Sequence, residues 1–239
     1  MVRTPPGSMG FSIPLSSGLR HDVRNHLRNQ IFDGTLQPGD RIVESRLARE
    51  LGISQTPVRE ALRELEQMGL VVSYPNRGAS VRRLDPRDVE EMYSLRAHLE
   101  ALGIARAIGV MSEDDLQALE ALITGMQLAA QDDNPQRLTE LDTSFHEYIL
   151  ERADHHLLLR TWQGISPLNW TMLTVLRLRD RNLAELADRH RPIVEALRSG
   201  EPSRAEAVIR DHVLSLGERV VRDLRRAEAA SLVDGIAEA

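Results

Sequence analysis

The stretch 44-ESRLARELGISQTPVREAL-62 decides the fold of the first part of the chain. It predicts two short helices, one over about Glu44 to Leu51 and a second that begins after Ser54. Gly52 ends the first helix, because glycine tolerates the left-handed conformation of a helix cap. Ser54 is typical of an N-cap, and Pro57 fits a first turn, where amides have no partner within the helix. Two short helices around a glycine-containing turn predict a helix-turn-helix.

The flanking segments complete a small domain. A helix is predicted over 19–32, with Ser17 as its cap, because apolar residues recur along one face at Val23, Leu27 and Ile31. Residues 71–74 and 79–82 predict two strands joined by a tight turn. This hairpin forms a wing, so residues 39–83 predict a winged helix-turn-helix, a fold that places one helix in the major groove of DNA.

Charge divides the chain near the end of this domain. The net charge is −6, but residues 1–83 carry 12 Arg against 8 Asp and Glu, a balance of +4. Residues 84–239 carry 18 Arg against 28 acidic residues, a balance of −10. A small basic part joined to a large acidic part predicts two domains with different partners.

Composition excludes several other classes of protein. The chain has no cysteine, which excludes disulfides and thiolate chemistry. No apolar run approaches the roughly 20 residues that span a bilayer, so we expect a soluble, cytoplasmic protein without a membrane partner. The Pro-, Gly- and Ser-containing residues 1–18 lack the features of a secretory signal and predict a flexible arm.

Polar side chains gather where the winged helix would meet DNA. Gln55, Thr56 and Arg59 begin the second helix of the pair and can reach base edges and phosphates in a major groove. Residues of the preceding helix suit backbone phosphates, and the wing tip suits phosphates or a minor groove. The predicted DNA-binding residues are Arg46, Arg49, Ser54, Gln55, Thr56, Arg59, Arg77 and Gly78. The alternatives are a winged helix used for protein contacts and, for single Arg residues such as Arg49, a solvated surface role.

From Asp85 to about Ala230 the pattern is helical throughout. Aromatic residues are few (3%), and prolines fall near first turns, as in helical bundles. The expected helices are 86–109, 112–131, 135–152, 155–163, 166–180, 181–199 and 202–227. The predicted fold class is therefore mainly α, with an N-terminal winged helix-turn-helix and a C-terminal all-α helical bundle.

Four polar residues lie on or beside the apolar faces of these helices. Asp142 and His146 are one turn apart and point the same way, while His190 and His212 each lie within an apolar face. Three inward His and one Asp predict a divalent metal site of the zinc, nickel or manganese class. Asp142 is either a ligand or a residue that orients a ligand. A single buried His is more often a hydrogen-bonded core residue, but burying all four without a shared partner is costly.

The first domain resembles a known family. The runs 36-LQPG-39 and 47-LARELGISQTPVREAL-62 are similar to the GntR family of bacterial repressors, over nearly all of residues 19–83. The resemblance implies DNA binding. Gln55 and Ser45 depart from it, since many members have basic residues at both positions, so we do not transfer a relative's operator sequence to this chain.

The second domain is more loosely similar, over about 86–226, to the FCD ligand-binding domain of the FadR subfamily. The similarity rests on the Asp-x-x-x-His run at 142–146, the His before Ile-Val-x-Ala-Leu, the later Asp-His, and Arg96-x-x-Leu99-Glu100. It implies a divalent metal on Asp142, His146, His190 and His212, with a small carboxylic acid bound beside it. Asp154 departs from the family, whose members often have Asn there.

Arg96 and Asn169 are the candidate effector contacts. Arg96 is one of the few basic residues within an apolar helix pattern, and a guanidinium suits a carboxylate. An ion pair with Glu100, one turn later, is the equal alternative for Arg96. A capping or core role is the alternative for Asn169.

The predicted domains are a flexible arm (1–18), a DNA-binding domain (19–84), a helical effector-binding and dimerisation domain (85–230) and a C-terminal tail (231–239). The predicted function is a homodimeric transcription regulator, a repressor of a short palindromic DNA operator, controlled by a small organic acid bound beside the metal. One alternative makes the metal itself the signal. Another is a metal-dependent hydrolase, but the sequence offers no general base beside the four ligands and no phosphate-binding loop, so we expect no enzyme.

Overall fold

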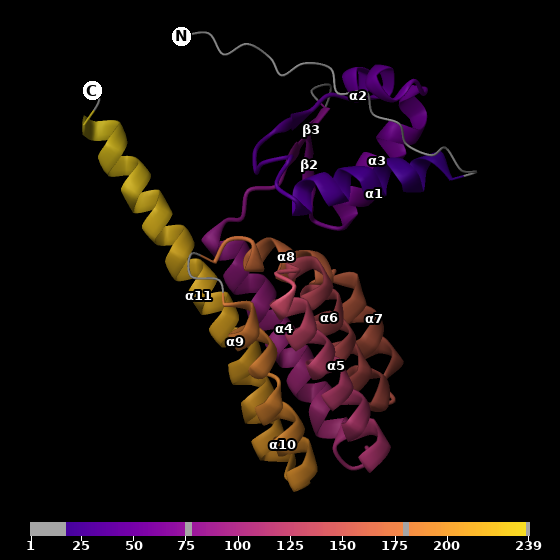
Figure 1. Cartoon of the computed structure of the whole chain (residues 1–239), viewed down its shortest axis with the longest axis vertical. Coiled ribbons are helices and arrows are strands. Elements are labelled where there is room, and N and C mark those ends of the chain that lie inside the picture. Colours follow the sequence, from indigo (N-terminus) through magenta and orange to yellow (C-terminus); the bar gives the residue numbers. More distant parts are fainter. Residues whose placement is uncertain (1–17, 75–77, 179–181, 238–239) are drawn as a thin grey trace. The chain divides into compact units, whose positions relative to one another are not determined.

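The structure, a computed structural model, describes residues 18–74, 78–178 and 182–237. The chain forms two compact units, residues 1–83 and 84–239 (Figure 1). The wing residue Arg77 and residues 1–17, nearly all of the predicted arm, lie outside the described residues. The predicted cap Ser17 is among them, and the N-cap of the first helix is Gly18 instead.

The first unit is a winged helix-turn-helix, as predicted. Its three strands form an antiparallel sheet in the order β1-β3-β2. The strand β1 was not predicted, because two residues are too few for an alternating pattern to show. The elements are α1 (Leu19–Phe32), β1 (Arg41–Ile42), α2 (Glu44–Leu51), α3 (Gln55–Gln67), β2 (Val71–Tyr74) and β3 (Gly78–Val81).

The ends of α2 and α3 follow from their sequences. Gly52 ends α2 with a φ of 67°, the left-handed conformation expected of a glycine cap. Ser54 is the N-cap of α3, although its side chain makes no capping hydrogen bond. The apolar face of α3 packs on α1, and the residues at its start stay exposed.

The second unit is all-α, as predicted, with no strand among its described residues. Asp85 caps α4 by accepting a hydrogen bond from the Arg87 amide, and Ser112 with Asp115 forms a capping box on α5. The helices are α4 (Pro86–Ala107), α5 (Glu113–Gln131), α6 (Pro135–Arg152), α7 (His156–Gly164), α8 (Pro167–Val175), α9 (Leu183–Asp188), α10 (Arg191–Ser199) and α11 (Pro202–Ala237).

Three predicted boundaries in this unit were wrong. The helix expected over 166–180 ends at Val175. The helix expected over 181–199 is two helices, because Pro192 lacks an amide hydrogen and its ring would clash with the carbonyl of residue 188. His190 therefore lies at the break, as the N-cap of α10. The last helix runs to Ala237 instead of 227, so most of the segment predicted as a C-terminal tail is helical.

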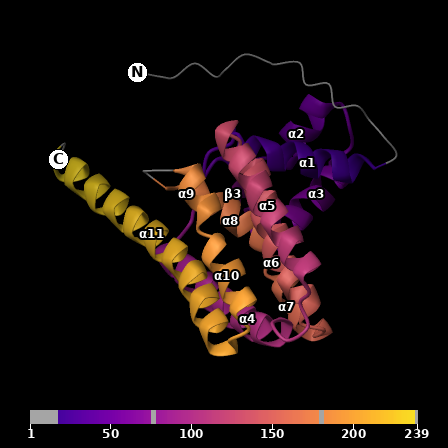
Figure 2. The same cartoon turned by 60° about the horizontal axis from the view of Figure 1, so that its bottom comes forward.

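The core of the second unit lies between α4, α5, α6 and α11. The long helix α11 packs along α4, and its last turns extend beyond the other helices of the unit (Figures 1 and 2). Tyr93 and Phe145 are among the largest fully buried side chains. This arrangement brings the inner faces of α6 and α11 toward the α9–α10 break. No helix of the described residues is long and apolar enough to cross a membrane.

Candidate metal centre and DNA-binding surface

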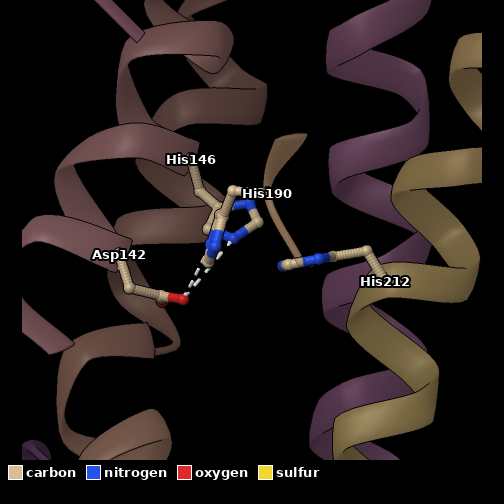
Figure 3. A group of neighbouring side chains, drawn as sticks. All are labelled: Asp142, His146, His190 and His212. Atoms are coloured by element: carbon tan, nitrogen blue, oxygen red, sulfur yellow. Dashed lines mark hydrogen bonds and ion pairs between the residues drawn. The ribbon is translucent and has the colours of Figure 1, made fainter. Parts of the chain in front are cut away.

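The structure brings the four predicted metal ligands together. Asp142 and His146 project from α6, His190 from the α9–α10 break and His212 from α11 (Figure 3). One ligand atom from each residue lies within 4.8 Å of the other three. Asp142, His146 and His190 are buried, and His212 is half-buried.

The ring of His190 is oriented by the backbone. Its Nδ1 lies 3.1 Å from the carbonyl oxygen of Ala187 and 3.2 Å from that of Leu186. A carbonyl only accepts, so Nδ1 carries the hydrogen. The other nitrogen, Nε2, lies 3.1 Å from Oδ1 of Asp142. If His190 is neutral with its hydrogen on Nδ1, its Nε2 and Oδ1 of Asp142 both direct a lone pair at each other. A cation, either a proton or a metal ion, therefore belongs between these two atoms.

His212 is oriented in the same way. Its Nδ1 lies 3.2 Å from the carbonyl oxygen of Arg189, which the helix break leaves accessible. Burial, followed by the charges of His190 and His146, holds the pKa of His212 well below its ordinary value. The ring is therefore neutral, which is the form that binds metal ions.

His146 contacts a carboxylate. Its Nδ1 lies 2.7 Å from Oε2 of Glu100. Burial alone would raise the pKa of Glu100, but the charges of Arg96 and His146 lower it to about 2, so Glu100 is ionised beside this ring. Burial would likewise raise the pKa of Asp142, yet the hydrogen bond with His190 and the neighbouring charges hold it below its usual range.

The donor set fits a divalent metal ion. All three rings direct Nδ1 toward an acceptor and leave Nε2 for the centre of the cluster, the arrangement typical of metal-bound histidine. Two atoms of the cluster, Nε2 of His146 and Oδ2 of Asp142, are buried without a hydrogen-bond partner among the described residues. Buried polar atoms of this kind are rare unless a ligand satisfies them.

A small pocket adjoins the cluster. Its volume is about 20 Å³, against the roughly 10–15 Å³ that a water molecule needs. Arg189 is the one basic residue of its lining, and its guanidinium donates to the carbonyl of His212 and to Ser215. The lining residues are Leu138, Asp142, Thr171, Val175, Leu186, Arg189, His190, His212 and Leu216.

The two predicted effector contacts do not line this pocket. Arg96 is buried, and its Nε lies 2.5 Å from Oε1 of Glu100, which is the ion pair considered as the alternative. Its NH1 donates to Thr171 at 2.8 Å. Asn169 is buried in α8. Arg96 is thus committed to Glu100 and Thr171, because both lie within reach inside the bundle.

Sequence reasoning missed Glu100 and Arg189 as parts of this site. Glu100 was considered only as a partner of Arg96, and Arg189 resembled an ordinary charged residue on a helix. Their roles depend on contacts with other helices, which periodicity within one helix does not reveal. The sequence signal that could have identified Arg189 was its position directly before His190 and three residues ahead of Pro192.

The first unit carries a polar groove between α2, α3 and the wing. Three predicted DNA-binding residues, Gln55, Arg59 and Gly78, lie together along it with Ser45. The groove also contains Arg41, Glu44 and Tyr74, which were not predicted. The remaining described candidates, Arg46, Arg49, Ser54 and Thr56, are exposed but do not line it.

Two contacts shape this groove. The Nε of Arg59 lies 3.0 Å from Oε2 of Glu44, so the start of α2 restrains a side chain of α3. Gly78 has a φ of 79°, and a Cβ there would lie 2.5 Å from the carbonyl oxygen of Ile42. Glycine is therefore required where the wing crosses β1.

Comparison with known proteins gives two family matches. The gntR family of bacterial regulatory proteins matches residues 19–81, and the FCD domain matches residues 91–215. The chain is 34% identical over 192 residues to the probable D-xylose utilization operon transcriptional repressor of Paenarthrobacter nicotinovorans, covering 80% of this chain and 84% of that protein. It is 25% identical over 189 residues to the gluconate operon transcriptional repressor of Bacillus subtilis, covering 77% and 76%.

Solved structures share the fold. McbR/YncC of E. coli has a TM-score of 0.67 at 24% identity, covering 87% of this chain and 100% of that one. A putative GntR transcriptional regulator from Rhodococcus sp. RHA1 has a TM-score of 0.68 at 22% identity, covering 84% and 97%. With both of its units matched, the chain belongs to the gntR family of bacterial regulatory proteins, carries an FCD domain, and is a DNA-binding transcription regulator rather than an enzyme.

Proposed function

We propose that this regulator is a repressor whose hold on its operator is controlled by a small carboxylic acid bound beside a divalent metal ion. The observation that carries the proposal is that three imidazoles and one carboxylate, three of the four residues buried, bring one ligand atom each within 4.8 Å of one another. The named relatives are repressors of sugar and sugar-acid operons, which supports the direction of control.

Asp142, His146, His190 and His212 would hold the metal. Three neutral imidazoles and one carboxylate leave a divalent ion with net positive charge and open coordination positions, which a ligand carboxylate can occupy. The side chains around the cluster keep bulk water away, which strengthens the attraction between the ion and an anionic ligand.

Arg189 is our candidate for the second contact of the effector. Burial lowers the pKa of its guanidinium, and no carboxylate lies within ion-pair distance of it among the described residues. A cation in this setting favours an anionic ligand. A pocket of about 20 Å³ must widen to admit an organic acid, so effector binding would change the packing of the helices around it.

On the DNA side, the groove of the first unit supports major-groove recognition by α3. Gln55 and Arg59 would contact base edges, while Arg46, Arg49, Ser54 and Thr56 would contact phosphates. A symmetric homodimer would bind the two halves of a short palindrome. An effector that changes the separation of the two α3 helices in the dimer would then weaken operator binding.

The test is a thermal-shift screen of small organic acids, sugar acids first, on metal-loaded and chelator-treated protein. The effector should raise the melting temperature only when metal is bound, and it should release the operator in a fluorescence-anisotropy titration. An equal thermal shift after chelation would separate the effector site from the metal.

A second candidate function is direct sensing of the metal. The pocket, at about 20 Å³, has room for little more than a water molecule beside the ion, which favours this reading. Titrating operator binding with metal and chelator in the absence of any acid distinguishes the two: metal alone should change the affinity only if the ion is the signal.

A further inference from the structure

Glu100 on α4 collects contacts from three buried side chains. Its Oε1 accepts from Nε of Arg96 at 2.5 Å and from Nε1 of Trp162 at 2.8 Å. Its Oε2 lies 2.7 Å from Nδ1 of His146. All four side chains are 2% exposed or less. The carboxylate thus accepts two hydrogen bonds at Oε1, while the close neighbour of Oε2 is a ring nitrogen of His146.

Arg96 and Glu100 face two candidate metal ligands across the interface of α4 and α6. Arg96 and Glu100 are one turn apart on α4, as Asp142 and His146 are on α6. Glu100 contacts His146, and NH2 of Arg96 lies 3.8 Å from Oδ2 of Asp142. A charged pair on one helix thus faces two candidate ligands on the other, the guanidinium toward the carboxylate of Asp142 and the carboxylate toward the imidazole of His146.

We propose that Glu100 is a positioning residue of the metal site, which keeps the proton of His146 on Nδ1 and presents Nε2 to the ion, while Arg96 holds Glu100 in place. The proposal rests on the proposed metal site. A ligating histidine whose other nitrogen donates to a carboxylate is fixed in tautomer and orientation, and loss of such a partner typically weakens metal binding about 10–100-fold.

A purely structural role explains the arrangement less well. A buried ion pair is often no more stabilising than apolar side chains of the same volume. The contacts of this pair, however, extend to two of the four ligands. If the Arg96–Glu100 pair served packing alone, nothing would require the carboxylate of Glu100 to lie against Nδ1 of His146, the nitrogen opposite the Nε2 that would bind the metal.

Glu100→Gln tests the proposal, because it preserves shape and changes one atom. Arg96 and Trp162 would keep the amide oxygen on their side, so the amide NH2 would face Nδ1 of His146. Nδ1 must then accept, and the proton moves to Nε2, the atom that would bind the metal.

The first measurement is the Zn²⁺ and Co²⁺ dissociation constant, obtained by competition with a chromophoric chelator. We expect it to rise about 10–100-fold in Glu100→Gln, with a changed Co²⁺ absorption spectrum. Glu120→Gln is the matched control, because Glu120 also pairs with an arginine, Arg198 at 2.9 Å, but on the exposed surface. The control should stay within twofold of the wild type.

The second measurement is independent of metal. Long-range ¹H–¹⁵N NMR of the metal-free protein reports which ring nitrogen of His146 carries the proton. We expect Nδ1–H in the wild type and Nε2–H in Glu100→Gln. A variant that keeps Nδ1–H and wild-type metal affinity overturns the proposal. If the wild-type protein binds no metal, the proposed metal site is wrong. The NMR measurement still tests whether Glu100 sets the tautomer of His146.

Glu100→Gln also removes the nearer carboxylate partner of the buried Arg96 and leaves it only Asp142 at 3.8 Å, which can prevent folding. The double variant Arg96→Met/Glu100→Gln removes both charges. If Glu100 positions His146, metal binding stays weakened in the double variant; if the pair only stabilises the bundle, wild-type affinity returns and the proposal fails.

Discussion

Arg59 lies in the second turn of α3, where its ion pair with Glu44 restrains a side chain that is still 53% exposed. A long side chain that is held in advance loses less conformational entropy when it contacts a base. The acidic partner also makes the groove less attractive to phosphate than a purely basic surface would be. If Arg59 contacts DNA as proposed, Glu44 would favour a directed hydrogen bond to a base over a contact with a phosphate made by charge alone.

Arg59→Ala should weaken binding to the specific operator by about tenfold to a hundredfold, because a good base contact contributes about 1–3 kcal/mol. The loss is measured by fluorescence anisotropy on an operator selected from random DNA. Arg63→Ala, an exposed arginine one turn further along the same helix, is the control and should retain affinity. Unchanged binding by Arg59→Ala would show that α3 does not read the DNA as proposed.

His190→Ala combined with His212→Ala should remove the metal from the protein, because two of three imidazole ligands are lost. Elemental analysis of the purified protein checks this, and the melting temperature should fall because the bound ion no longer stabilises the fold. His98→Ala with His156→Ala, two exposed histidines, should keep the ion. Stoichiometric metal in the first double variant would contradict the assigned ligands.

At the level of secondary-structure elements, the break between α9 and α10 helps to orient the candidate metal ligands. It turns the carbonyls of Ala187 and Arg189 toward His190 and His212. Two of the three histidines are therefore oriented by backbone that an unbroken helix would use for its own hydrogen bonds.

Pro192→Ala should lower metal affinity, by about tenfold if it acts as loss of a histidine's hydrogen-bond partner does. Alanine restores an amide that can pair with the carbonyl of residue 188, which favours one continuous helix and withdraws the Arg189 carbonyl from His212. Chelator competition gives the affinity, and circular dichroism gives the gain in helix. Pro202→Ala, at the first turn of α11, should change neither.

The contact between α4 and α11 depends on Gly217. A Cβ there would lie 2.7 Å from Cγ and 2.8 Å from Cβ of Tyr93, atoms close to the α4 backbone. The Tyr93 hydroxyl is held at 2.7 Å by Thr174, so the ring has little freedom to move.

Gly217→Ala should therefore lower the free energy of unfolding by about 1–3 kcal/mol, the usual cost of overpacking. The midpoint of urea unfolding measures this. Gly109→Ala, where no atom lies within 4 Å of the added Cβ, should leave the midpoint unchanged or slightly higher. An equal effect of both substitutions would mean that α11 adjusts its distance from α4 freely.

The molecule as a whole follows from its sequence to different degrees. The bounds of α1 and α2 agree with the prediction, because their apolar faces and the residues that end them, Asp33 and Gly52, are encoded locally. The break at His190 was missed because the apolar pattern of residues 183–197 continues across it. The four candidate ligands could be named from spacing and resemblance, whereas the contacts of Glu100 come from side chains of α4, α6 and α7, which only the folded bundle brings together.

The proposed homodimer makes a prediction about the operator. The protein should sediment as a dimer and bind a palindrome far more tightly than a single half-site. Five base pairs inserted between the half-sites rotate one half-site by about half a helical turn relative to the other. The two α3 helices of the dimer then cannot both lie in the major groove. Equal affinity for the original and lengthened operators would show that each reader binds alone.

The connection between the two units is short in sequence: only Arg83 lies between the last hydrogen-bonded residue of the first unit and the first core-packed residue of the second. The Arg82 amide is hydrogen-bonded to the Leu70 carbonyl at 2.9 Å, and Leu84 already packs against the core of the second unit. A single residue separates these two anchors along the chain, so lengthening the connection after Arg83 tests whether the proposed effector acts on DNA binding through it. A variant with four Gly-Ser residues inserted after Arg83 should still bind its operator, but the proposed carboxylic-acid effector should no longer release it.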